Sequence, residues 1–372
     1  MRAKSDSLLN GVRAAVRGAL ALPARLSHGR RLSVIRRSDS RTPIVSFGGV
    51  LEGRRLIHGG AVKLIHLRDA YAWNEQTFNL LYLVSSAPPV FAEDLLNRCD
   101  KLGIPLVWNQ NGVAYPGWAG KDTNRYNDPM RRLRARAQYV IYQSAFCRDS
   151  AERFLGHSDA ASEVLFNPVD LQKFHPTADL LPASPLRLLT LGTHGYRERV
   201  FSTIRCARAL KDSGTDCSLT IAGRLGWPGG PADIRREIAR VDLEKAVTVL
   251  PSFTQDEAAE LYRRHHILVH PKYLDPCPTV VIEALSCGLP VIGSASGGLP
   301  EIVAPSCGAL IPAPVSWEKL ITPTGEQLAA AVESLIPRLR QAALAARAHA
   351  EANFDGTKWV ERHASIFRSV LT

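Results

Sequence analysis

The chain has 372 residues, 45% of them hydrophobic, a mean hydropathy of −0.07 and a formal net charge of +11. This length exceeds one ordinary hydrophobic core and predicts two domains of common size in a soluble, globular protein. No stretch approaches the roughly 18 uncharged apolar residues that a membrane-spanning helix needs, which excludes a membrane-spanning protein.

The positive charge is concentrated at the N-terminal end of the chain. Residues 1–42 hold ten basic and two acidic side chains, a formal charge of +8, so the rest of the chain carries only +3. That rest shows no dense stripe of Lys and Arg with interleaved aromatic residues, which is the pattern of a nucleic-acid-binding surface. We therefore expect no nucleic acid among the partners.

The N-terminal extension, residues 1–41, is predicted to contain a short basic amphipathic helix. Its apolar residues have helical spacing as far as the proline at position 23: Leu8, Val12, Ala15, Ala19 and Leu22. Such a helix is suited to an anionic membrane surface, which would make a cytoplasmic protein peripheral on the inner face of the plasma membrane. A transit peptide and a basic leader without a partner are the alternatives.

Residues 42–180 alternate short apolar runs with helical stretches and are predicted to form a first α/β domain. The predicted strands include "PIVSF", "FNLLYLVSS", "IPLVWNQNG" and "QYVIYQS", and the predicted helices include "AEDLLNRCDKLG" and "AFCRDSAERFLG". This alternation is typical of parallel strands joined by crossover helices.

A second α/β domain is predicted over residues 181–356, after the Pro-rich linker "TADLLPASPL". Its strands are expected at "LRLLTLG", "CSLTIAG", "AVTVLPS", "HILVHP" and "PVIGSASGG". The Ala- and Leu-rich tail is predicted to be helical, and residues 357–372 are expected to pack back on the first domain. Two tandem domains with parallel sheets are expected to create a ligand-binding cleft between them.

The seven cysteines are odd in number, scattered and without any CxxC spacing, so we expect neither a disulfide framework nor a zinc site. A reducing cytoplasm is the simplest setting for them. Cys277 and Cys287 flank the motif described below, but cysteines near a site are more often small buried hydrophobic residues than nucleophiles.

Glycine-rich turns are candidates for an anion site, because a turn that opens a helix presents backbone N–H groups and the positive end of the helix dipole. Four turns fit this role: Gly59 with Gly60, Gly192, the turn ending in Thr279, and Gly297 with Gly298. Each turn is also explained by backbone geometry alone. Their recurrence in order favours a ligand that carries a diphosphate.

The stretch "DPCPTVVIEALSCGLPVIGSASGGLPE" places Asp275 and Glu283 eight positions apart. If Thr279 begins a helix, Glu283 lies about one turn into it and Asp275 stands in the preceding loop. A carboxylate beside a diphosphate is unfavourable unless it accepts hydrogen bonds from hydroxyl groups, as when an acid binds a ribose or a hexose. The alternative is that Glu283 caps a helix and Asp275 belongs to a plain turn.

This stretch resembles the E-x7-E donor signature of retaining GT-B glycosyltransferases of the glycosyltransferase family 4 group, with Asp275 and Glu283 as the two acids. The resemblance extends over most of residues 56–366 and includes "VLFNPVDLQKFHP" and "LTLGTHGYRERVFSTIRCARAL". It implies a GT-B fold, with two Rossmann-like α/β domains. It also implies the transfer of a sugar from a nucleotide-diphosphate-sugar to a glycan or lipid-linked acceptor with retained anomeric configuration, as in polysaccharide biosynthesis.

The resemblance also implies roles for individual residues. Asp275 would bind the sugar hydroxyls, Glu283 the ribose hydroxyls, and Arg199 the leaving phosphate, and these three form the implied catalytic set. The backbone N–H groups of Thr279 and Val280 would hold the diphosphate. The implied donor-binding set is completed by Gly59, Gly60, Gly192, Thr193, Gly297 and Gly298. No metal and no other cofactor are expected, since the nucleotide-sugar is a substrate.

Three departures from the family pattern bear on donor identity and catalytic strength. Gly192 is followed by Thr193 and His194 where the family commonly has an Arg. Pro278 stands where a Gly is common and removes one N–H donor. Asp275 is one methylene shorter than Glu.

The acceptor side is predicted from "VWNQNGVAYPGWAG", which offers Asn109, Asn111 and Tyr115, residue types that hydrogen-bond to sugars or stack on them. The Asn-Gly pair is equally a turn signal. Two other functions remain open from the sequence: a non-hydrolysing nucleotide-sugar epimerase, and a non-catalytic nucleotide-sugar-binding subunit of the same fold.

Overall fold

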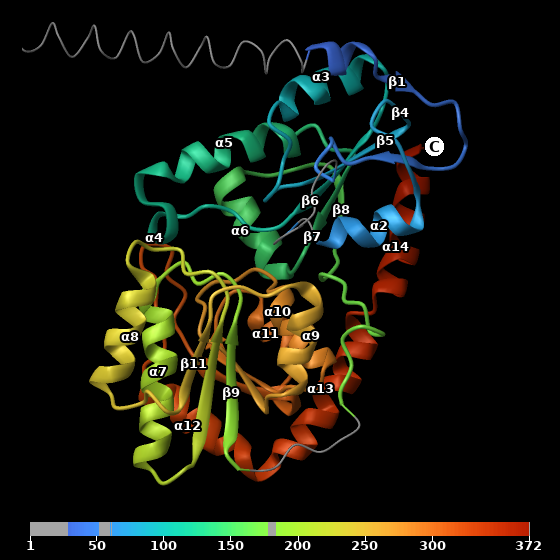
Figure 1. Cartoon of the computed structure of the whole chain (residues 1–372). Coiled ribbons are helices and arrows are strands. Elements are labelled where there is room, and N and C mark those ends of the chain that lie inside the picture. Colours follow the sequence, from blue (N-terminus) through green and yellow to red (C-terminus); the bar gives the residue numbers. More distant parts are fainter. Residues whose placement is uncertain (1–28, 52–59, 61, 178–183, 372) are drawn as a thin grey trace, which may run out of the picture. The chain divides into compact units, whose positions relative to one another are not determined.

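The computed structural model describes residues 29–51, 60, 62–177 and 184–371. The chain divides into two compact units, each discontinuous in sequence (Figure 1). The first contains the residues up to 108, 133–139 and those from 365 onward, and the second contains residues 109–132 and 140–364. The amphipathic helix predicted near residues 8–22, and residues 178–183 of the predicted linker, lie outside the described residues.

A six-stranded sheet is formed by the N-terminal half of the chain, in the order β3-β2-β5-β6-β7-β8. Its strands are β2 (Ile44–Ser46), β3 (Ala72–Trp73), β5 (Leu80–Val84), β6 (Leu106–Gln110), β7 (Tyr139–Tyr142) and β8 (Ala161–Val164). β2 pairs in parallel with both β3 and β5. Every residue of β5 is buried, as expected for a strand of a parallel sheet covered on both faces. A small parallel pair joins β1 (Arg36–Arg37) to β4 (Thr77–Phe78).

The helices of this half are α2 (Lys63–Ala70), α3 (Ala92–Lys101), α4 (Pro116–Ala119), α5 (Thr123–Arg134) and α6 (Ala145–Leu155). The last helix of the chain, α14 (Gly356–Leu371), contributes its end to the first unit. There the Phe367 ring packs edge-on against the rings of Tyr71 and Tyr82, with centroids 5.0 and 6.0 Å away.

The second unit contains a six-stranded sheet in the order β11-β10-β9-β12-β13-β14, with every pair parallel. Its strands are β9 (Leu186–Leu191), β10 (Cys217–Ala222), β11 (Val247–Leu250), β12 (Ile267–His270), β13 (Val291–Ala295) and β14 (Gly308–Pro312). In chain order this is the 3-2-1-4-5-6 arrangement of a Rossmann sheet. Because the order reverses between β9 and β12, the carboxyl ends of these two strands mark the expected ligand position.

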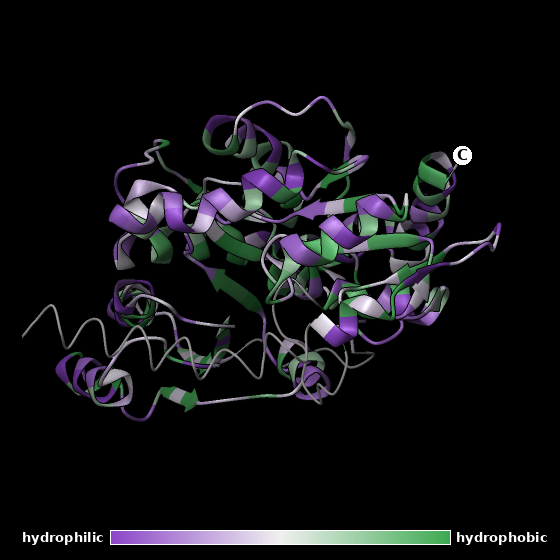
Figure 2. Cartoon of the chain, turned by 90° about the horizontal axis from the view of Figure 1, so that it is seen from above, coloured by the Kyte–Doolittle hydropathy of each residue, from purple (hydrophilic) through white to green (hydrophobic). Residues whose placement is uncertain are grey.

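Two hydrophobic clusters cover the two faces of this sheet. β9 buries Leu186 and Leu188 in one cluster and Leu189 and Leu191 in the other, as the alternation of a strand requires. The first cluster includes residues of α7 (Arg197–Asp212), α8 (Gly230–Arg240) and α12 (Gly325–Leu335), and the second includes residues of α9 (Gln255–Arg263), α10 (Thr279–Ser286) and α13 (Leu339–Asn353). Figure 2 shows the strands as mostly hydrophobic and the helices with hydrophilic faces.

All seven cysteines are buried, and burial raises the pKa of the Cys287 thiol to about 12, so this thiol is poorly suited to act as a nucleophile. In the part of the chain that the structure describes, no helix combines the length and the apolar character needed to cross a membrane.

Candidate functional site

The turn after β9 is shaped by glycine. Gly192 has φ +119°, a conformation that favours glycine, and its N–H donates to the carbonyl of Ala222 at the end of β10, at 3.0 Å. Thr193 follows in an exposed position, whereas His194 is buried and its Nε2 lies 3.1 Å from the same carbonyl. A Cβ added to Gly192 would lie 3.6 Å from Val280 Cγ1, so this turn lies against the start of α10.

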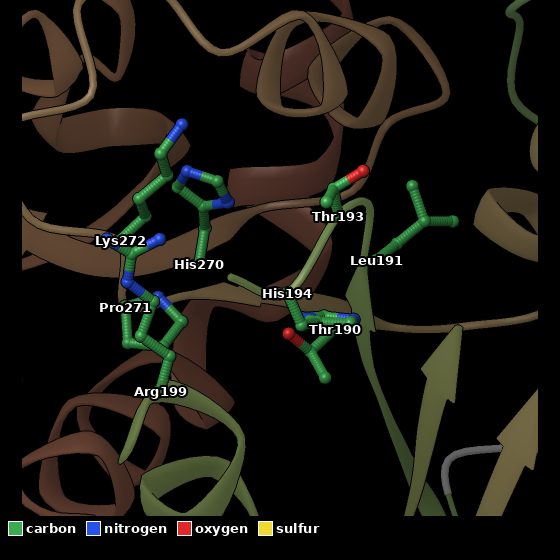
Figure 3. A pocket seen from close by; sticks show the side chains of 8 residues that line it. All are labelled: Thr190, Leu191, Thr193, His194, Arg199, His270, Pro271 and Lys272. Carbon is green, nitrogen blue, oxygen red and sulfur yellow. The ribbon is translucent and has the colours of Figure 1, made fainter. Parts of the chain in front are cut away.

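A pocket lies where β9 and β12 end (Figure 3). It is lined by Thr190, Leu191, Thr193 and His194 from β9 and its turn, by Arg199 from the first turn of α7, and by His270, Pro271 and Lys272 from the end of β12. Arg199, His270, Pro271 and Lys272 gather on one side of the pocket in Figure 3. The pocket therefore occupies the position that the strand order predicts for a ligand.

Asp275 lies next to this pocket as a buried carboxylate, 5% exposed. Its Oδ2 atom is 2.7 Å from Lys272 Nζ and 3.3 Å from His270 Nε2. Burial by itself would raise the pKa of Asp275, but the charge of Lys272 and the hydrogen bond from His270 outweigh burial and hold this pKa below its usual range. Asp275 is thus a carboxylate at neutral pH.

Gly297 and Gly298 support the loop that carries Asp275. The Gly298 N–H donates to the Asp275 carbonyl at 2.8 Å, and a Cβ on Gly298 would lie 2.0 Å from the Pro276 carbonyl oxygen. Gly297 has φ +67°. In the structure these two glycines therefore place Asp275, and the Gly298 N–H is engaged by the protein's own backbone.

Arg199 is half-buried, and its guanidinium lies 4.9 Å from the centroid of the Tyr196 ring. Burial lowers its pKa, which the nearby Asp275 carboxylate partly offsets. An arginine remains charged in any case. Tyr115, predicted on the acceptor side, is also within electrostatic reach of Arg199, although burial dominates and raises the pKa of its phenol.

The helix predicted to begin at Thr279 does so, since α10 starts at this residue. Pro278 is its N-cap, and no side chain caps the helix. Thr279 and Val280 are half-buried at its N-terminus, where the positive end of the helix dipole attracts an anion. Asn167 buttresses this turn: its Nδ2 donates to the Cys277 carbonyl at 2.9 Å and lies 3.4 Å from Thr279 Oγ1.

Glu283 lies one turn into α10 and is 4% exposed. Its Oε2 accepts a hydrogen bond from the Tyr262 hydroxyl at 2.9 Å. Burial raises the pKa of Glu283 to about 7, and the hydrogen bonds from the side chains of Tyr262 and Gln255 oppose this rise. The two acids of the motif therefore differ: Asp275 is firmly ionised, and Glu283 titrates near neutral pH.

The structure thus places the predicted residues in several groups. Arg199, Thr193 and Gly192 meet Asp275 and the start of α10 at one end of the second sheet. The predicted acceptor residues Asn109 and Asn111 are buried, at 1% and 8% exposure, and Tyr115 is 7% exposed. Gly59 lies outside the described residues, and Gly60 belongs to the first unit.

Several residues of this site were missed in the sequence analysis. Lys272 and His270 belong to no motif, although His270 is the last residue of β12 and Lys272 lies two positions beyond it, at the strand end where ligands of parallel sheets bind. Tyr262 is 21 positions from Glu283 and gave no signal in the sequence. Among the described residues no group of three or more His, Cys, Asp or Glu could hold a metal ion.

Part of the chain is similar in sequence to known glycosyltransferases. Residues 173–324 match the family model described as "Glycosyl transferases group 1". D-inositol 3-phosphate glycosyltransferase of Mycobacteroides abscessus is 31% identical over 235 residues, which cover 57% of this chain and 51% of that protein. The chain thus spans about half the length of such curated relatives.

Solved structures with the same fold align with a larger part of the chain than the relatives found by sequence do. Sucrose-phosphate synthase from Thermosynechococcus elongatus has a TM-score of 0.64 at 20% identity, with 83% of this chain and 76% of that chain covered. The Anabaena protein Alr3699/HepE, solved in complex with UDP-glucose, has a TM-score of 0.64 at 17% identity, with 84% and 90% covered. These likenesses confirm the predicted fold class, two Rossmann-like α/β domains of the GT-B type.

Proposed function

We propose, from the group 1 glycosyltransferase domain that residues 173–324 carry, that this protein transfers a sugar from a nucleotide-diphosphate-sugar to a glycan or lipid-linked acceptor. The observation that carries the proposal is the pocket at the carboxyl ends of β9 and β12. Arg199 lines this pocket, and the Gly192 turn beside it lies against the uncapped N-terminus of α10. Asp275 stands in the loop before α10, and Glu283 lies one turn into this helix. A diphosphate between two groups of hydroxyls matches this distribution of charge.

In this proposal each acid has its own part of the donor. Glu283 accepts hydrogen bonds from the ribose hydroxyls in place of the Tyr262 hydroxyl, and Asp275 accepts them from the sugar hydroxyls. The N–H groups of Thr279 and Val280 hold the diphosphate, with Gly192 and Thr193 beside it. The anomeric configuration is retained, and no metal takes part.

Arg199 stabilises the negative charge that develops on the leaving diphosphate. Fixed donors and cations aimed at such a charge are usually the largest contribution to catalysis in a partly buried site. The N-terminus of α10 adds the favourable end of its dipole. The leaving diphosphate itself takes the proton of the acceptor hydroxyl as the new glycosidic bond forms.

For the acceptor we propose the region of Asn109, Asn111 and Tyr115. Tyr115 supports this assignment, because it is within electrostatic reach of both Arg199 and Asp275. The two buried asparagines are proposed to support this region from the protein interior, since their low exposure leaves little surface for direct contact with the acceptor.

The donor is tested by incubation with radiolabelled UDP-, GDP- and ADP-sugars together with extracted bacterial lipids and glycans. The structure of Alr3699/HepE with UDP-glucose makes UDP-sugars the first choice. We expect label to enter an extracted acceptor with release of the nucleoside diphosphate. The new glycosidic bond is expected to have the same anomeric configuration, α or β, as the donor. Donor binding without transfer would indicate a non-catalytic binding subunit, and conversion of the free nucleotide-sugar to its epimer would indicate an epimerase.

We further propose that residues 1–42, with their charge of +8, hold the protein on an anionic membrane surface. Each basic residue near such a surface contributes on the order of 1 kcal/mol. Full-length protein is expected to sediment with liposomes that contain anionic lipid at low salt, and less so at high salt. A protein that begins at Arg41 is expected to stay in the supernatant. Equal sedimentation of both proteins, or binding that salt does not affect, would contradict the membrane proposal.

A further inference from the structure

The pocket at the ends of β9 and β12 has an unusual charge. None of its eight lining residues is acidic. Burial lowers the pKa of His194 to about 4 and also lowers the pKa of His270, so both rings are uncharged near pH 7. Arg199 and Lys272 are therefore the two lining residues that carry a full positive charge, and they reach the pocket from different elements.

Lys272 lies between this pocket and Asp275. Its ammonium is 2.7 Å from Asp275 Oδ2, and an ammonium has three N–H donors. Its side chain is 41% exposed, whereas that of Asp275 is 8% exposed. The ammonium can thus donate to the buried carboxylate, and its side chain is exposed enough to offer its other donors to a ligand in the pocket that Lys272 lines.

We propose that Lys272 is a second cationic ligand of the donor diphosphate, beside Arg199, and that it bridges the diphosphate to Asp275. This inference rests on the proposed function, in which the pocket receives a nucleotide-diphosphate-sugar. It assigns a role to a residue that belongs to none of the sequence motifs.

Electrostatics favours such a bridge. The diphosphate of a nucleotide-sugar carries two negative charges, and Asp275 adds a third negative charge at the same end of the sheet. At short range in a partly buried site, two like charges repel each other strongly. Lys272 separates the carboxylate from the phosphate and attracts both, so that the sugar-binding acid and the diphosphate can occupy neighbouring positions.

The test is calorimetric titration of the parent and of Lys272→Met with UDP, GDP and ADP, and with the corresponding nucleoside. Loss of one charge-assisted hydrogen bond is expected to weaken binding of the preferred nucleoside diphosphate at least about tenfold, and to leave binding of the nucleoside unchanged. Lys272→Arg is expected to keep most of the affinity. Lys245→Met, which removes an exposed lysine that does not line the pocket, serves as the matched control.

A second comparison separates this role from simple neutralisation of Asp275. If Lys272 only compensates the buried carboxylate, its removal has no effect once Asp275 is also neutral. We therefore compare Asp275→Asn with the double variant Lys272→Met/Asp275→Asn, which buries no unpaired charge and is expected to fold. The proposal predicts that the double variant binds the nucleoside diphosphate about tenfold more weakly than Asp275→Asn.

Equal affinity of the double variant and Asp275→Asn would overturn the role of Lys272, while leaving the proposed function intact. A parent protein that binds none of the three nucleoside diphosphates would instead overturn the proposed function, and this inference with it.

Discussion

Arg199→Ala is expected to lower the rate of sugar transfer by about 100- to 1,000-fold, the effect of removing one preorganised group that stabilises developing charge. Affinity for the nucleotide-sugar should fall less, because the leaving group gains negative charge only as the bond breaks. Steady-state kinetics with the donor found in the transfer assay measures both effects.

The thermal midpoint of Arg199→Ala is expected to stay close to that of the parent. Asp275 keeps its two direct partners, Lys272 and His270, so no buried charge is left unpaired. Arg199→Lys should retain part of the activity, because it supplies the charge without the planar guanidinium. Arg197→Ala is the control: Arg197 is an exposed residue of the same helix and forms an ion pair with its neighbour Glu198. If Arg199→Ala and the parent are equally active, Arg199 is not at the phosphate site.

Glu283→Gln is expected to stabilise the protein at pH 8 and to weaken its binding of nucleotide. The pKa of Glu283 is about 7 in the folded protein and 4.5 as an isolated group, so the folded state prefers the protonated acid. The stability of the parent therefore falls as the pH rises from about 4.5 through 7. At pH 8 the ionised form is destabilised by on the order of 3 kcal/mol.

Glutamine removes this cost because it is neutral at every pH, and its amide oxygen can still accept from the Tyr262 hydroxyl. Urea unfolding should show the variant to be more stable than the parent at pH 8, with a difference that shrinks toward pH 5. Glu244→Gln, at an exposed position, should show no such trend. A difference that is the same at both pH values would contradict the raised pKa of Glu283.

The same variant should bind the preferred nucleoside diphosphate roughly tenfold more weakly, since a neutral amide replaces a charged acceptor of the ribose hydroxyls. Higher stability combined with weaker binding is the pattern expected of a residue kept for function at a cost in folding. Unchanged affinity in a calorimetric titration would remove Glu283 from the ribose site.

Much of the second unit could be predicted from its sequence. The apolar runs of β9, β10, β11, β12 and β13 are short and regular, and α10 begins at Thr279 as expected. Local hydrophobic patterns suffice for such elements because a strand of a covered parallel sheet is apolar throughout. The sequence analysis did not place β8, β14 or α8.

The partners of the two acids could not be predicted, for two different reasons. Lys272 reaches Asp275 through a loop in which Leu274 adopts φ +50°, a conformation that a non-glycine residue rarely takes and that no local pattern announces. Tyr262 reaches Glu283 from the neighbouring helix α9, and only the packing of the two helices brings them together. Sequence reasoning therefore found the acids but not the side chains that bind them.

The role of a glycine pair is also hard to predict from sequence alone. The assignment of Gly297 and Gly298 to the donor-binding set stays a prediction, and in the structure they also hold the Asp275 loop, where a side chain on Gly298 would collide with Pro276. A glycine pair after a strand gives the same sequence signal in both cases, since each requires a close approach to the backbone.

A crystal structure with the preferred nucleoside diphosphate would show whether the pocket where β9 and β12 end binds the diphosphate of a nucleotide-sugar. We expect phosphate oxygens at the Arg199 guanidinium and at the N–H groups of Thr279 and Val280, with the ribose hydroxyls at Glu283. A nucleotide bound elsewhere on the protein, or one whose ribose lies away from Glu283, would contradict this assignment of the donor site.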